Sequence, residues 1–191
     1  MSQYYFFVAS LPFLSYDNED QSTPEGFLAD ARKHLTPHEC ATVSRARIDA
    51  PVDLEPGPPV VTSWQRFERG LRNELVKVRA AKLDGDAAEY LRVDEAGSDD
   101  TDRTGLADTA RGAFAEESPL TGEDLLGRAR WEFLNELEVG HFFDLDRLVI
   151  YYLKLQILAR KRRFNRTDGE RVFRLAKDKI VNDYYQEQGN E

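Results

Sequence analysis

Two histidines at helical spacing are the first candidates for chemistry in this sequence. His34 and His38 lie four residues apart, and Cys40 follows two residues later. Two imidazoles at positions i and i+4 of one helix share a face, a spacing that zinc sites use. Between them, however, stand Thr36, which favours a helix cap, and Pro37, which favours the first turn of a new helix. We therefore predict two separate solvated histidines rather than a pair of metal ligands.

A second metal-like pattern is Glu138-x-x-His141. Carboxylate-bridged di-iron bundles need two such pairs on two helices and a further glutamate from each of two other helices. The sequence holds no second pair, and Gly140 is expected to end the helix inside this one. We predict no metal site and no cofactor. A metal-dependent helical-bundle enzyme stays as an alternative.

Nucleotide and acyl-transfer chemistry lack their usual motifs. The nearest approach to a phosphate-binding loop, residues 105–112, lacks the Lys-Ser/Thr ending that completes it. No serine stands in a Gly-x-Ser-x-Gly context. Cys40 lies near His38, but the sequence shows no residue to orient that imidazole. We predict no catalytic residue and a protein that is not an enzyme.

Charge is spread very unevenly along the chain. The 191 residues carry 35 acids and 26 bases, a net charge of −9, which argues against a general nucleic-acid binder. The stretch Arg147–Lys179 nevertheless holds eleven bases and three acids, so it carries +8 and the remainder carries −17. Because such asymmetry steers association, we predict that a partner docks on the basic region.

Two groups of cations are the predicted partner-binding surfaces. Phe164 and Phe173 interleave with the C-terminal group, as in some RNA binders. The negative charge elsewhere would repel a polyanion, so we favour an acidic protein patch as the partner and expect no nucleic acid. A helical adaptor or RNA-associated protein stays as an alternative. The predicted residues are Arg160, Lys161, Arg162, Arg163, Arg166, Arg171 and Arg174 in the C-terminal group, and Arg66, Arg69 and Arg72 in the other.

Five segments must position these residues, and we expect them to form one domain. No pair of alternating strands is apparent, and the last connections are short. The predicted fold class is therefore mainly α, an antiparallel helical bundle with a long acidic loop and a Pro-rich linker. The segments are an N-terminal helical segment (1–50), a Pro-rich linker (51–62), an amphipathic helix (63–92), an acidic mobile loop with a weak helix (93–120) and a C-terminal three-helix unit (121–191).

Helix starts are the clearest local signals. Thr23 and Thr36 each precede a proline and an acidic residue, the composition of a capped first turn. Ser63 is expected to cap the next helix, Thr121 to open another, and Asp144 to cap the long helix that carries the basic turn. Aromatic residues on the apolar stripes of these helices should lie in the core; they are Trp64, Phe67, Trp131 and Phe133.

The sequence also limits the compartment. Its single cysteine fits a reducing environment. The longest apolar runs, Leu148–Leu153 among them, are far shorter than a membrane span, and residues 1–8 lack the basic region of a signal peptide. We expect a cytoplasmic protein.

Four segments carry a resemblance that spans nearly the whole chain. They are Tyr4–Pro12, Trp64–Leu75, Arg130–Asp146 and Tyr151–Gln156. The chain resembles an uncharacterised bacterial family of unknown function whose genes typically sit among those for a V/A-type (vacuolar-like) ATP synthase.

The resemblance implies a non-catalytic helical subunit or accessory protein of a V/A-type proton- or sodium-translocating ATPase. One form of that role is a short counterpart of the helical funnel of the central stalk, the component that joins the rotor shaft to the membrane ring. The implied partners are other subunits of that ATPase. They would hold the chain at the inner membrane face without a transmembrane span of its own.

Overall fold

The computed structural model describes residues 4–17, 22–49, 58–93, 98–100, 105–164 and 177. Helices dominate these residues, and no strand occurs among them, which confirms the mainly α prediction. The elements are α1 (Tyr5–Ser10), α2 (Pro24–His34), α3 (Pro37–Arg45), α4 (Pro59–Lys82), the 3-10 turn η1 (Ala88–Tyr90), α5 (Leu106–Ala115), α6 (Pro119–Glu138) and α7 (Leu145–Arg163).

Three of the predicted caps are confirmed. The Thr23 hydroxyl accepts a hydrogen bond from the Gly26 amide at 3.0 Å. Thr36 and Glu39 form a reciprocal capping box, so α2 ends and α3 begins between the two histidines. The Asp144 carboxylate accepts from the Arg147 amide at 2.8 Å and starts α7. At each site a side-chain oxygen replaces the carbonyl that the first turn lacks.

Two predicted helix starts lie too far along the chain. Helix α4 begins at Pro59 rather than after Ser63, and α6 begins at Pro119 rather than at Thr121. Proline fits the first helical position because its φ is preset and its missing N–H has no partner there anyway. The end of the predicted linker is therefore helical and buries Val60, whereas residues 51–57 lie outside the described residues.

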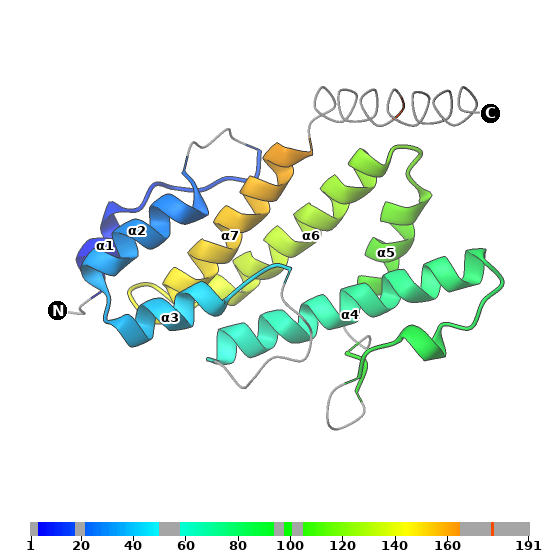
Figure 1. Cartoon of the computed structure of the whole chain (residues 1–191), viewed down its shortest axis with the longest axis horizontal. Coiled ribbons are helices and arrows are strands. Elements are labelled where there is room, and N and C mark those ends of the chain that lie inside the picture. The colour runs from blue at the N-terminus through cyan, green and yellow to red at the C-terminus, as the bar shows by residue number, and fades with distance from the viewer. Residues whose placement is uncertain are drawn as a thin grey trace, which may run out of the picture.

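Helix α7 lies in the middle of the molecule. Figure 1 shows it between α6 and α2, and it also contacts α3 and α4. Every residue from 148 to 155 is buried, as neighbours on several sides require. Helix α5 packs against both α4 and α6. Gly140, at φ 92°, ends α6 as predicted, so that α6 and α7 run antiparallel.

The four predicted core aromatics are all buried. Phe67 and Phe133 stack with ring centroids 4.2 Å apart, and Trp64 stacks on Phe67 at 5.9 Å. Trp131 meets Tyr16 edge to face at 5.7 Å. These contacts join α4 to α6 and the N-terminal segment, and such pairs add to the stabilisation from burial alone.

Described residues of the predicted acidic loop contact α4. The Asn73 side-chain amide donates to the carbonyl oxygens of Arg92 and Asp99 and accepts from the Arg92 amide. Arg69 pairs with Asp100 at 2.6 Å, and both side chains are largely buried. The described residues 98–100 are thus held against α4, and the predicted weak helix is α5.

No helix in the described residues combines the length and the apolar character needed to cross a bilayer.

Candidate functional site

The last turn of α7 carries four consecutive cations, Arg160, Lys161, Arg162 and Arg163, which we call the cationic turn. A helix C-terminus has a partial negative charge, so cations are stabilised there. Arg162 donates to the Ser22 carbonyl oxygen at 2.9 Å, and Arg163 is exposed. The structure therefore gathers four of the predicted partner-binding residues at one end of the central helix.

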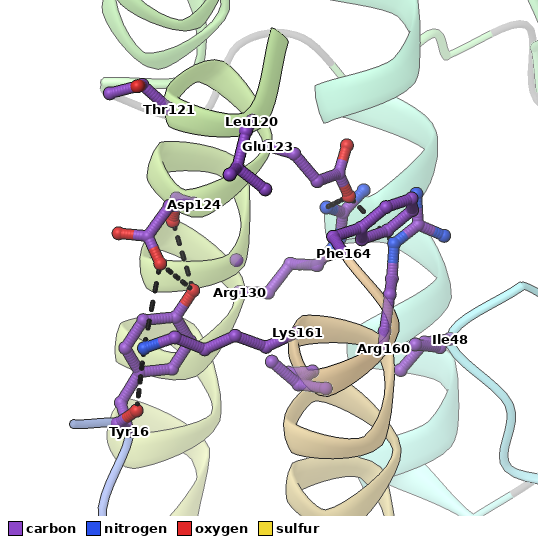
Figure 2. Close-up of a pocket in the computed structure, with 12 residues that line it drawn as sticks. Tyr16, Ile48, Leu120, Thr121, Glu123, Asp124, Arg130, Arg160, Lys161 and Phe164 are labelled. Carbon is purple, nitrogen blue, oxygen red and sulfur yellow. Dashed lines mark hydrogen bonds and ion pairs between the residues drawn. The ribbon is translucent and has the colours of Figure 1, made fainter. Parts of the chain in front are cut away.

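A cavity of about 390 Å³ lies beside the cationic turn, between the first half of α6 and the end of α7. Figure 2 shows charged side chains from both helices around it. Apolar side chains, among them Leu120, Ile48 and Ile157, form part of its wall. Phe164 also lines it and is 45% exposed. The cavity combines apolar surface with fixed charge, as recognition sites do.

Two carboxylates of α6 hold the cationic turn in place. Glu123 accepts from Arg160 Nε at 2.7 Å. Asp124 lies 3.6 Å from Lys161 Nζ, which also donates to the Tyr16 carbonyl oxygen at 3.0 Å. These contacts restrict two flexible side chains that would otherwise move freely in solvent.

Tyr16 closes the side of the cavity that the N-terminal segment covers. Its hydroxyl bonds to both the carboxylate and the backbone carbonyl of Asp124, at 3.0 and 3.1 Å. Burial, and then the hydrogen bond to Asp124, raise the pKa of Tyr16 well above its ordinary value. Gly127 makes this approach possible, because a methyl group there would collide with the Tyr16 hydroxyl.

A chain of ion pairs connects the cavity to α4. Arg130 Nε lies 2.5 Å from Glu68 Oε1, and both side chains are buried. Arg72 contacts the other oxygen of Glu68 at 3.3 Å, and Arg130 lies 3.9 Å from Glu123, the partner of Arg160. Alternating charges thus run across α4, α6 and α7 from one predicted cationic group to the other.

The three predicted arginines of α4 do not share one exposed face. Arg66 is exposed, whereas Arg69 is buried in its pair with Asp100. Arg72 is half-buried and donates to the Ile48 carbonyl oxygen at 3.0 Å in addition to its contact with Glu68. Only Arg66 is therefore open to a partner in the described structure. The remaining predicted residues, Arg166, Arg171 and Arg174, lie outside the described residues.

The metal-like patterns of the sequence have other partners. His34 stacks on Phe7 with ring centroids 4.9 Å apart, and His141 Nδ1 lies 2.7 Å from Asp144. Glu138 contacts Arg147 and Lys154. Within the described ranges, no group of three or more His, Cys, Asp or Glu side chains is placed to hold a metal ion.

The contact between Glu138 and Lys154 borders a second cavity of about 320 Å³. The Lys154 amine also lies 5.2 Å from the centre of the Trp131 ring, a cation–π geometry. Burial and the neighbouring Arg147 guanidinium lower the pKa of Lys154 to about 8.

The sequence analysis missed most acidic members of the site. Glu68, Glu123 and Asp124 look like ordinary wet-face residues of amphipathic helices, but their carboxylates meet cations from other helices. One signal was available: Glu68 and Arg130 directly adjoin the aromatic residues Phe67 and Trp131 on apolar stripes. A charge at such a position needs a buried partner of opposite sign.

Comparison with known proteins identifies a family. A family model described as "Protein of unknown function (DUF2764)" matches residues 55–184. The match covers well over half of the chain and includes α4 to α7, but not the segment that contributes Tyr16. No curated protein and no solved structure matches the chain significantly.

Proposed function

We propose that this chain, a member of the DUF2764 family, is a non-catalytic helical subunit or accessory protein of a V/A-type proton- or sodium-translocating ATPase. The four segments named in the sequence analysis, which resemble a family encoded beside such ATPases, support the choice of complex. The cationic turn supports the manner of docking, and it is the observation that carries the proposal.

The cationic turn suits an acidic partner surface because it is prearranged. Three cations (Arg130, Arg160 and Lys161) and two carboxylates (Glu123 and Asp124) line the adjoining cavity, so that its lining keeps a net positive charge. Arg160 and Lys161 are already fixed by Glu123, Asp124 and Tyr16. Fixed side chains lose less conformational entropy on binding than free ones, and complementary charge raises the rate of encounter.

The connections between helices suit a part that transmits force. The Glu68–Arg130 pair and the Phe67–Phe133 stack tie α4 to α6, and α6 packs along α7. Densely packed interiors have low compressibility and transmit strain. We therefore place the protein, within this proposal, at the junction of the rotor shaft and the membrane ring.

Affinity purification of the tagged full-length chain from cells that make it naturally tests the proposal. Mass spectrometry should find V/A-type ATPase subunits with the native protein. The double variant Arg162→Glu/Arg163→Glu should recover at least about tenfold less, as expected for losing electrostatic complementarity. Arg32→Glu is the matched control because Arg32 is also an exposed arginine in the last turn of a helix, α2.

The outcomes separate two parts of the proposal. If the native chain recovers no ATPase subunits, the assignment to this complex is wrong. If the double variant recovers as much as the native chain, the complex stands but docking through the cationic turn is wrong. If the native chain, the double variant and Arg32→Glu unfold at the same temperature, a lower recovery of ATPase subunits reflects weaker binding and not a loss of folding.

A further inference from the structure

An exposed group of aromatic side chains lies at the end of the molecule where α7 begins. It combines α1 with the loop that joins α6 to α7, two segments far apart in sequence (Figure 1). The rings of Tyr5 and Phe143 touch, with centroids 4.7 Å apart. Phe6 is 69% exposed, Phe142 71% and Val139 80%. We call these five residues the aromatic patch.

The aromatic patch differs from scattered surface hydrophobics. Single exposed apolar side chains are ordinary, whereas contiguous exposed groups mark interaction surfaces. Helix α1 turns Phe7 into the core against Phe27 and turns Phe6 outward. The contact of Tyr5 with Phe143 holds the two segments together, so the rings present large apolar area at low entropic cost.

The charge on the loop side of the aromatic patch is negative. The segment Glu136–Arg147 carries four acids and one base, a net charge of −3. Glu138 contacts both Arg147 and Lys154, and with Lys154 included the net charge is −2. Asp144 and Asp146 flank the nearby His141. An acidic border attracts basic groups and repels anionic lipid headgroups and phosphate backbones.

The second cavity lies inward from this end of the molecule, and its lining combines apolar side chains with Glu138, Arg147 and Lys154. Val8 of α1 and Glu138, next to Val139, both line it, so it adjoins the aromatic patch. Trp131 lies in its wall, and Phe13, which is 90% exposed, also lines it. A pocket with an aromatic wall is where a partner's anchoring side chain gains most on binding.

We propose that the aromatic patch docks a segment of another protein that is both apolar and basic. This site lies at the opposite end of α7 from the cationic turn and takes a partner of opposite charge. The inference goes beyond the proposed function, since it follows from the aromatic patch and its charge whichever complex the protein joins.

A synthetic probe tests this inference without the ATPase. The probe is a fluorescein-labelled 14-residue amphipathic helix of leucine and lysine, titrated with the full-length chain in 150 mM NaCl while fluorescence anisotropy is measured. We expect saturable binding. Phe6→Ser and Phe142→Ser should each weaken it at least about tenfold, the loss typical of one aromatic hot spot. Both side chains are mostly exposed, so the variants should keep the native unfolding temperature.

Two controls isolate the features on which the inference depends. Tyr90→Ser removes an aromatic ring that is 65% exposed but lies in η1, and it should leave binding unchanged. A probe with glutamate in place of lysine keeps the apolar face and should bind at least about tenfold more weakly because the border is acidic.

Several results would overturn the inference. Equal binding by the two serine variants and the native chain would show that net charge alone attracts the probe. Equal binding of the acidic probe would remove the basic requirement. Flotation with phosphatidylcholine/phosphatidylserine vesicles that Phe142→Ser abolishes would assign the patch to lipid. Self-association in sedimentation that Phe142→Ser abolishes would assign it to a second copy of the chain.

Discussion

The buried pair of Glu68 and Arg130 should contribute strongly to the stability of the native chain. Removing one partner of a buried ion pair typically costs about 3–5 kcal/mol because the other charge stays buried and unmatched. In Glu68→Ala, the one carboxylate that Arg130 keeps among the described residues is Glu123, at 3.9 Å, so the compensation is weak. In Arg130→Ala, Glu68 keeps Arg72 at 3.3 Å. We therefore expect about 3 kcal/mol for each, the lower end of that range.

Urea and thermal unfolding, followed by circular dichroism, measure this loss. In a chain of this size a loss of about 3 kcal/mol lowers Tm by about 6–12 °C. The control is Arg128→Ala, two residues away on α6, because Arg128 pairs with Asp17 and Asp124 at the surface. Exposed pairs contribute at most about 1 kcal/mol, so this variant should unfold near the native temperature.

The double variant Glu68→Leu/Arg130→Met tests the same site with neither charge present. It removes both charges and keeps much of the volume, so it should cost less than either single alanine variant. The reasoning is refuted if each single variant costs less than about 1 kcal/mol, as for a solvated pair. It is also refuted if the double variant costs as much as either single alanine variant, since no unmatched buried charge would then explain the single losses.

Two further predictions concern glycine and tyrosine. Gly70→Ala should loosen residues 98–100, because a methyl group there would collide with the Asp100 carbonyl oxygen. Amide hydrogen exchange around Asp100 should become faster, and the free energy of unfolding should fall by about 1–3 kcal/mol. Gly112→Ala, whose methyl group would have no described atom within 4 Å, should instead stabilise α5 by up to about 1 kcal/mol, and faster exchange or lower stability there would contradict this. The folded-state pKa of Tyr16 is raised, so its hydroxyl stabilises the folded chain fully below about pH 10, and this stabilisation is lost as the pH rises further. In urea titrations, the difference in unfolding free energy between the native chain and Tyr16→Phe should therefore shrink above about pH 10. A difference that stays constant would refute burial and the Asp124 hydrogen bond as the cause.

Local signals in the sequence predicted much of the fold. Thr23, Thr36 and Asp144 were correctly placed as caps because a cap depends on one side chain and the next three residues. The starts at Pro59 and Pro119 were missed because proline tolerates both a linker and a first helical turn. Packing of Val60 into the core decides that choice for α4.

The candidate site was only half visible in the sequence. Composition located the cations of the cationic turn, because a run of like charge needs no knowledge of the fold. It did not separate Arg66, which is exposed, from Arg69, which is buried against Asp100. Residues on one helix differ in exposure according to what packs against each face, and that information is long-range.

By itself, therefore, the sequence determined the helical class, the capped helix starts and the polarity of charge along the chain, since each follows from neighbours a few residues apart. Only the tertiary structure decided which charges are matched. Glu68 meets Arg130 across 62 residues of sequence, and Tyr16 meets Asp124 across 108. The aromatic patch arises in the same way, from Tyr5 and Phe143. Ion pairs and ring contacts depend on distance in space, and burial makes them strong by removing the water that would otherwise screen the charges.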